Sequence, residues 1–329
     1  HMTLLPFRCH PLLKSRVWGG EQLLEWNKPL PGGNTNQWGE SWELADLPED
    51  IPDARSIIRD GPLAGQNFHD AIVQQAPVLM GDLPKSPHGG FPLLVKLLDA
   101  QRNLSVQVHP TAEYAAAHPN AYKKDEAWLI LDAKPDSLLY TGLADGVTPA
   151  ELHAAAQLGQ DLEPLMHAVP AIPGACHVLP SGTCHALGAG ILVAEFQTPS
   201  DTTYCIWDWG REGREMHLDQ AVACMSPGRA APPCTTPAHA DGLEISIVAN
   251  TPAFVLRTLR TPDRRIIQSP PSDRPEIWMI LEGEMHCESM RWTKGDTIFF
   301  PAQRDVSIEV TAGSRWVHCH LPIGQERLA

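Results

Sequence analysis

Leu104-Ser-Val-Gln-Val-His-Pro110 is the stretch of this chain from which its fold can be argued most directly. The stretch is typical of a β-strand. Side chains of a strand point alternately to its two faces, so Ser105, Gln107 and His109 are predicted to share one face. An amide oxygen and an imidazole, both potential metal ligands, therefore lie side by side at positions i and i+2.

Two downstream residues complete this set of ligands. Glu126 contributes a carboxylate, and Pro180-Ser-Gly-Thr-Cys-His185 ends in a second imidazole. Two nitrogen and two oxygen donors suit a zinc-like divalent cation that keeps room for a substrate. The pattern indicates a metalloenzyme. Zinc is favoured only modestly, because amide and carboxylate oxygens also suit manganese or iron.

The composition indicates a β-rich protein with a sizeable core. The chain has 329 residues, of which 43% are hydrophobic, and its 31 prolines and 25 glycines indicate many turns. A net charge of −14 argues against nucleic acid or an anionic membrane as a partner. A phosphorylated small molecule is still compatible, because a few lysines and arginines can form a local positive pocket.

Neither a membrane span nor an export signal is predicted, because no apolar run reaches the roughly 20 residues that a bilayer requires. The eight cysteines are scattered and include no C-x-x-C pair. We therefore expect reduced thiols and a cytoplasmic location. His1 and Met2 resemble a cloning remnant and carry no argument.

Two units are expected along the chain: a metal-binding catalytic part at 3–240 and a metal-free β unit at 241–329. The proline-rich passage 227–241 is predicted to be a linker. Helices are predicted within the first unit, at 66–80, at 111–122 with Thr111 as its N-cap, and at 149–168 with Thr148 as its N-cap.

Pro180, Gly182 and His185 form a Pro-x-Gly-x-x-His pattern that is similar to the second metal-binding motif of the cupin superfamily. Gly295-Asp296 followed by Pro301 resembles the equivalent turn of a second cupin barrel without metal. The resemblance implies a mainly β fold of two jelly-roll barrels, with helices inserted in the N-terminal part.

More narrowly, the chain resembles the type I mannose-6-phosphate isomerase family in its short bacterial form. The resembling segments run in family order through about the first two-thirds of the chain. They are Arg16-Val-Trp-Gly-Gly20, Gly39-Glu-Ser-Trp-Glu43, Gly61-Pro-Leu-Ala-Gly65, Phe91-Pro-Leu-Leu-Val-Lys96, Leu104 to Pro110, Lys124-Asp-Glu-Ala-Trp128, Gly182-Thr-Cys-His-Ala-Leu-Gly188, Glu195, Ser200-Asp-Thr-Thr-Tyr204 and Asp208-Trp-Gly-Arg211.

The resemblance implies one zinc ion per chain. Its ligands would be Gln107, His109, Glu126 and His185, which are the residues already suggested by their chemistry. The family reaction interconverts mannose 6-phosphate and fructose 6-phosphate through an enediol. A small sugar phosphate is thus the implied partner, and we expect a monomer, with a dimer as the alternative.

Substrate contacts are implied for a second group of residues. Lys96 also stands out by itself, because it interrupts an apolar run and a buried ammonium needs a partner. The proton carrier stays open between metal-bound water, an acid at the pocket rim and a lysine. The implied pocket residues are Trp18, Lys96, Ser105, Lys124 and, at the rim, Asp201.

One position departs from the family pattern. Where the family has an arginine directly after Thr-Tyr, this chain has Cys205. Arg211 is a candidate replacement, provided that the strand carrying Cys205 continues unbroken. The departure leaves two alternatives open: an isomerase or epimerase for a different or unphosphorylated sugar, and a non-catalytic sugar-binding homologue that kept the metal.

Overall fold

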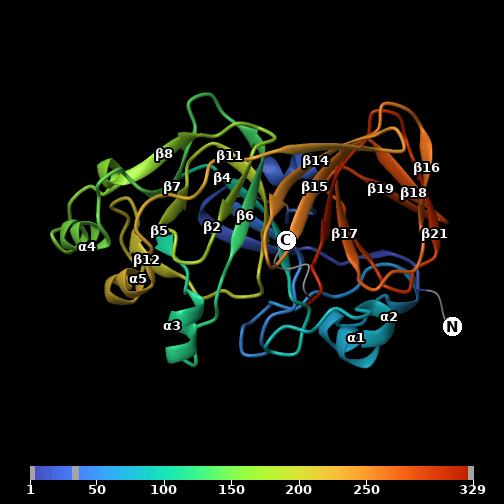
Figure 1. Cartoon of the computed structure of the whole chain (residues 1–329), viewed down its shortest axis with the longest axis horizontal. Helices are drawn as coiled ribbons and strands as arrows, with labels where there is room; N and C mark the ends of the chain where they lie inside the picture. The colour runs from blue at the N-terminus through green and yellow to red at the C-terminus, as the bar shows by residue number, and fades with distance from the viewer. Residues whose placement is uncertain (1–3, 32–36, 325–329) are drawn as a thin grey trace.

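The computed structural model describes residues 4–31 and 37–324. The protein is mainly β, as expected, and its strands form four antiparallel sheets. Figure 1 shows these sheets in sequence from left to right, with a five-stranded sheet at one end and a four-stranded sheet at the other. The larger six-stranded and seven-stranded sheets lie between them. No helix of the described residues has the length and apolar character needed to cross a membrane.

The first pair of sheets is built from the N-terminal two-thirds of the chain. The six-stranded sheet has the order β2 (Leu12–Gly20), β3 (Trp38–Leu44), β4 (Leu94–Ala100), β11 (Ile191–Gln197), β6 (Glu126–Ala133) and β9 (Cys176–Leu179). The five-stranded sheet has the order β12 (Tyr204–Trp207), β5 (Val106–Val108), β10 (His185–Leu187), β7 (Leu138–Leu143) and β8 (Met166–Pro170).

The second pair is built mostly from the C-terminal third. The seven-stranded sheet has the order β1 (Phe7–Arg8), β20 (Thr297–Phe300), β17 (Glu276–Glu282), β22 (Arg315–His320), β15 (Val255–Arg260), β14 (Leu243–Asn250) and β13 (Thr236–Ala240). The four-stranded sheet has the order β16 (Arg265–Ser269), β21 (Val306–Val310), β18 (Glu284–Cys287) and β19 (Met290–Thr293).

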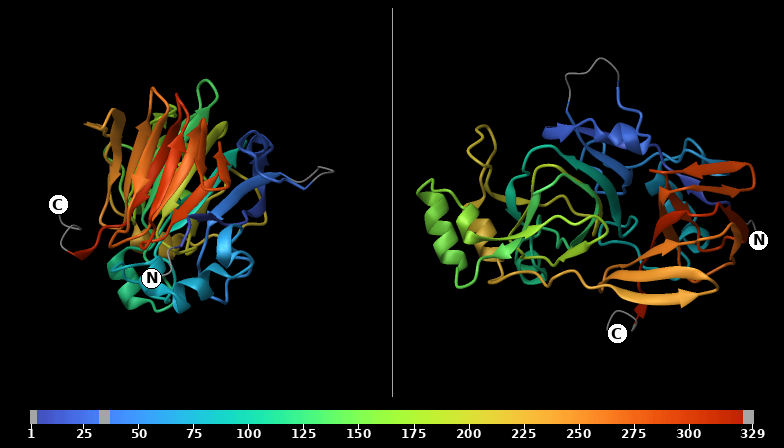
Figure 2. Two further views of the ribbon diagram at one scale, coloured as in Figure 1. Left: turned by 90° about the vertical axis from the view of Figure 1, so that its right-hand side faces the viewer. Right: turned by 90° about the horizontal axis from the view of Figure 1, so that it is seen from above.

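Two details of the seven-stranded sheet differ from the sequence-based expectation. The predicted linker is wrong over Thr236–Ala240, because these residues form β13 and pair with β14. The N-terminal strand β1 also belongs to this sheet, where Phe7 lies opposite Phe299 of β20. Strands from near both ends of the described chain therefore contribute to one sheet. Figure 2 shows the C-terminal sheets, coloured mostly orange and red, in two further views.

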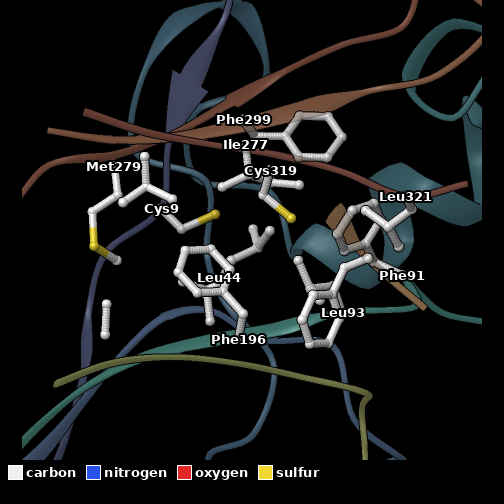
Figure 3. Packing of buried hydrophobic residues seen from close by; sticks show 14 of the residues in the cluster. Cys9, Leu44, Phe91, Leu93, Phe196, Ile277, Met279, Phe299, Cys319 and Leu321 are labelled. Carbon is white, nitrogen blue, oxygen red and sulfur yellow. The ribbon is translucent and has the colours of Figure 1, made fainter. Parts of the chain in front are cut away.

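The largest hydrophobic core fills the space between the six-stranded and seven-stranded sheets. Phe196 of β11 lies across this core from Ile277 and Phe299 of the other sheet (Figure 3). Phe299 stacks on Phe7 with ring centroids 5.0 Å apart, and it meets Phe68 edge-on at 5.4 Å. The two sheet pairs are thus joined by a continuous apolar layer.

Strand alternation divides the six-stranded sheet between two environments. On β4, Val95 and Leu97 enter the large core, whereas Leu98 and Ala100 enter a second core shared with the five-stranded sheet. β6 and β11 alternate in the same way. Lys96 lies on the Leu98 side by this alternation and is 7% exposed. The functional residues of these strands consequently point between the sheets of the first pair.

The helices are shorter than the sequence predicts. The expected helix at 66–80 is broken into α1 (Phe68–Gln74) and α2 (Ala76–Leu79). α3 (Ala112–Ala117) begins at Thr111 as predicted but ends before His118-Pro119. A proline disfavours the helical conformation of the residue before it, which accounts for this end.

α4 (Pro149–Gln157) begins with the predicted cap, since Thr148 and Glu151 form a reciprocal capping box. It ends near Gly159, which adopts a positive φ of 66°. The rest of the expected helix is a 3₁₀ turn followed by β8. α5 (Leu218–Cys224) follows β12 and lies beside α4 at the outer end of the first pair (Figure 1).

Candidate metal centre and substrate cavity

The strand pairing of the five-stranded sheet brings the sequence motifs together. Gln107 on β5 lies opposite His185 on β10, and on its other side it lies opposite Cys205 on β12. Directly opposed residues of antiparallel strands direct their side chains to the same face. The two halves of the sequence pattern therefore meet in a row across three strands.

Three of the four expected ligands form a compact buried cluster. The potential ligand atoms of His109, Glu126 and His185 all lie within 4.8 Å of one another. Nε2 of His109 is 3.3 Å from Oε2 of Glu126, and Nε2 of His185 is 3.0 Å from Oε1. None of the three residues is more than 2% exposed. Gln107, the fourth expected ligand, lines the adjoining cavity.

The two imidazoles are oriented by backbone carbonyls. Nδ1 of His109 lies 3.1 Å from the carbonyl oxygen of Thr202, and Nδ1 of His185 lies 2.8 Å from that of Thr183. A carbonyl oxygen only accepts a hydrogen bond, so each ring donates from Nδ1 and, when neutral, keeps a lone pair on Nε2. This arrangement is the usual support of a metal-binding histidine.

Electrostatics keep His109 and Glu126 in the protonation states that a cation requires. Burial and the ammonium of Lys124 lower the pKa of His109 to about 3, so its imidazole is neutral at neutral pH. Burial alone would raise the pKa of Glu126, but Lys124, His109 and His185 hold that pKa well below its ordinary value. Neutral imidazoles and an ionised carboxylate are the forms that bind metals.

The donor set fits a divalent cation. Nε2 of both histidines and both carboxylate oxygens of Glu126 are buried and make no hydrogen bond of acceptable geometry in the described structure. Buried polar atoms are normally satisfied, and each exception needs an explanation. Two imidazoles and a carboxylate whose ligand atoms lie close together, with an amide alongside, could hold one such ion, which would account for these exceptions.

A cavity of about 620 Å³ adjoins the cluster. The substrate-contact residues expected from the sequence share its wall. They are Trp18, Lys96, Ser105, Lys124 and Asp201.

Both cavity lysines are buried and paired with carboxylates. Nζ of Lys96 lies 3.2 Å from Oε2 of Glu195, and Nζ of Lys124 lies 3.0 Å from Oε2 of Glu126. Burial would lower the pKa of Lys96, but the neighbouring carboxylates, chiefly Glu195 and Glu40, raise it. Both lysines are therefore held in place beside the metal-type cluster.

A second cross-strand row supports Lys96. Trp42, Lys96, Glu195 and Trp128 lie opposite one another on β3, β4, β11 and β6. The indole N–H of Trp128 donates to Glu195, and the Lys96 ammonium lies 5.0 Å from the ring centre of Trp42. Glu195 does not follow from metal-ligand spacing. Its signal in the sequence is a lone acid within the apolar run Ile191–Gln197.

Among the residues expected to contact substrate or act in catalysis, Arg211 is the one that the described cavity wall does not include. Its guanidinium donates to the backbone oxygen of Asn103 and to Asp208. β12 ends at Trp207, so the strand does not continue to position 211, as the expectation for Arg211 required. Arg214, which motif reasoning missed, lines the cavity instead.

The fold and this site define a β-rich protein with a buried metal-type centre at the end of a polar cavity. Comparison with known proteins narrows this class. Residues 7–130 match the model of the phosphomannose isomerase type I catalytic domain. The mannose-6-phosphate isomerase ManA of Bacillus subtilis is 36% identical over 227 residues, which are 67% of this chain and 68% of that protein.

A second relative is the mannose-6-phosphate isomerase of Streptococcus mutans, which is 31% identical over 259 residues, or 76% of this chain and 77% of its own length. The crystal structure of the mannose 6-phosphate isomerase from Bacillus subtilis superposes with a TM-score of 0.83 at 26% identity. That superposition covers 97% of this chain and 100% of the other. The chain belongs to the type I phosphomannose isomerase family and is an aldose–ketose isomerase.

Proposed function

We propose that the protein interconverts mannose 6-phosphate and fructose 6-phosphate. The observation that carries the proposal is the buried cluster of His109, Glu126 and His185, which lies beside a cavity lined by Lys96 and Lys124. The names of the Bacillus and Streptococcus relatives support the choice of sugar. A cavity of about 620 Å³ is within the usual range for a small-molecule site.

Gln107, His109, Glu126 and His185 would hold one divalent cation, and zinc is our proposal for its identity. The two imidazoles favour zinc, and the compact arrangement of the ligand atoms fits a single ion. When bound, such an ion polarises substrate oxygens and stabilises negative charge that develops on them.

The chain's own residues would hold the open-chain sugar and control its protons. Isomerisation removes the proton from C2 of the aldose, forms an enediol and returns a proton to C1. Lys96 and Lys124 are fixed by Glu195 and Glu126, so each can donate hydrogen bonds to sugar oxygens without reorganising. Asp201 at the exposed rim and the two lysines are our candidates for carrying the proton. Trp18 and Ser105 would contact the substrate from the same wall.

A different or unphosphorylated sugar is the second candidate substrate, and Cys205 is the observation that favours it. A coupled assay with mannose 6-phosphate and with free mannose separates the two. We expect turnover of the phosphorylated sugar, loss of turnover with a chelator and recovery with zinc. Turnover of the free sugar alone would support the second candidate, and zinc binding without turnover of any sugar would support a non-catalytic homologue.

We also propose that each pair of sheets is a cupin-type jelly roll. The catalytic unit would be 3–240 and the second unit 241–329, to whose seven-stranded sheet the first unit adds the edge strands β1 and β13. Support comes from the two separate cores, one within each sheet pair. All eight cysteines are unpaired, which fits our proposal of a cytoplasmic protein. A monomer is our proposal for the oligomeric state, and size-exclusion chromatography with light scattering tests it.

A further inference from the structure

Arg214 occupies a part of the cavity for which the sequence motifs provide no residue. It lies in the segment between β12 and α5, and it lines the cavity together with Ser105, Asp201 and Thr203. The residue itself is exposed. It therefore offers a guanidinium at the solvent-accessible side of the site.

Cys205 lies close to Arg214. Burial raises the pKa of the Cys205 thiol, whereas the nearby Arg214 guanidinium and Ser105 hydroxyl lower it. Cys205 lies opposite Gln107 on the neighbouring strand, so its side chain points to the cavity face of the sheet. A cysteine side chain is short, and a longer side chain at position 205 would extend into the space where the guanidinium lies. The small side chain at position 205 is therefore what allows the Arg214 guanidinium to lie at the cavity wall.

Arg214 differs from three neighbouring cationic side chains, which are each paired with a carboxylate. Lys96 is paired with Glu195, Lys124 with Glu126, and Arg16 with Glu40 at 2.9 Å. Among residues 4–31 and 37–324, Arg214 has no carboxylate partner within ion-pair distance.

Lys14 is the other cavity cation without such a partner in this part of the chain. Its ammonium donates to the backbone oxygen of Asp53 and lies 4.8 Å from the ring centre of Trp42. Burial lowers the pKa of Lys14. An arginine, by contrast, stays charged at any working pH, and its planar fork matches two oxygens of a phosphoryl group.

We propose that Arg214 binds the phosphoryl group of the substrate and makes the cavity selective for a phosphorylated sugar. The inference rests on the proposed function, because it takes a sugar phosphate as the ligand. The short side chain of Cys205 leaves room for the guanidinium at the cavity wall, which Ser105 also lines. The lysines then donate hydrogen bonds to the sugar oxygens near the metal-type cluster, while Arg214 binds the phosphoryl end of the substrate.

Binding of a ligand that cannot react tests this directly. Mannitol 1-phosphate, the reduced form of mannose 6-phosphate, keeps the phosphoryl group and lacks the carbonyl. Calorimetric titration of the zinc-loaded protein with this ligand is compared among the wild type, Arg214→Ala and Arg214→Lys. We expect binding to weaken about 10- to 100-fold in Arg214→Ala, as for loss of hydrogen bonds to a charged group, and less in Arg214→Lys.

Two controls separate this role from general effects. Arg264→Ala removes one positive charge from an exposed ion pair with Glu309 outside the cavity and should leave binding unchanged. Zinc content and the circular dichroism spectrum of Arg214→Ala should equal those of the wild type, because the residue is exposed. In the isomerase assay, Arg214→Ala should raise KM for mannose 6-phosphate with kcat within about twofold, the signature of lost ground-state binding.

Equal affinity of the wild type and Arg214→Ala for mannitol 1-phosphate would overturn the inference, as would absence of binding to the wild type. A fall in kcat at unchanged KM would also overturn it, because Arg214 would then act on the reacting carbons. If the wild type binds mannitol 1-phosphate through Arg214 but does not turn over mannose 6-phosphate, the proposed function fails while the phosphoryl site stands. The experiments can therefore refute either proposal without refuting the other.

Discussion

Glu195 on β11 lies directly opposite Lys96 on β4, and the carboxylate and the ammonium meet at 3.2 Å inside the first pair of sheets. Glu195 also accepts the indole N–H of Trp128. The relationship explains how an ammonium is tolerated in an otherwise apolar strand. It also fixes the direction in which Lys96 points, toward the cavity beside the metal-type cluster.

Removing one partner of this pair should be costly. We expect Lys96→Met to destabilise the fold by about 3–5 kcal/mol, because a buried carboxylate is left without its counter-charge. Urea unfolding monitored by tryptophan fluorescence measures the change. The double variant Lys96→Met/Glu195→Gln should recover much of that stability but no activity. A double variant as unstable as Lys96→Met would show that the charge of Glu195 is not the cause.

Metal content should depend on the buried donors. We expect about one zinc per chain by atomic absorption, as for a single site with protein ligands, and loss of most of it in His109→Ala or His185→Ala. Chelation should lower the melting temperature, because a ligand bound only to the native state stabilises it. His318→Ala, a change in the second pair of sheets, is the matched control, since His318 contacts Glu276 rather than the cluster. Unchanged zinc content in both cluster variants would contradict the assigned site.

Acid should weaken the second pair of sheets through Glu276. Burial alone would raise the pKa of this residue, but hydrogen bonds and charges from His318 and Arg304 lower it from 4.5 to about 2. The native state thus binds the proton more weakly than the unfolded state, so the carboxylate stabilises the fold above pH 4.5 and loses this effect as the pH falls toward 2. The contribution is on the order of 3 kcal/mol.

Glu276→Gln tests this pH dependence. Its free energy of unfolding should be lower than that of the wild type at neutral pH, and the difference should shrink between pH 4.5 and 2. Urea unfolding at a series of pH values measures it. A difference that stays constant over this range would assign the effect of the substitution to packing rather than to ionisation.

The apolar layer between the sheet pairs should control stability more than catalysis. Phe299→Ala removes a fully buried ring that contacts Phe7, Phe68 and Phe91, and we expect a loss of about 3–5 kcal/mol. Activity per folded molecule should remain, because the layer lies on the opposite face of the six-stranded sheet from the cavity. Phe299→Leu should cost less. A kcat that falls in proportion to stability at low temperature would show that the layer also positions the site.

Local sequence rules succeeded where the structure depends on near neighbours. Ser105 and Gln107 line one cavity as period-two alternation predicts, and Thr111 and Thr148 cap helices as expected. The same rules predicted helices that are longer than those in the structure. The predicted helix at 149–168 ends early, because glycine at 159 stops it and the residues after the turn are used in the five-stranded sheet.

The sequence by itself determined the chemistry of the centre: the Gln-x-His pair, the later glutamate and histidine, and a lysine that could not stay in an apolar strand without a partner. These inferences hold because side-chain direction along a strand and the cost of burying a charge are local properties. Only the tertiary structure decided which other side chains lie beside these residues. Strand pairing placed Glu195 beside Lys96, and the path of the chain after β12 brought Arg214 rather than Arg211 to the cavity. Such contacts depend on the order of strands and the course of loops, which no local pattern encodes.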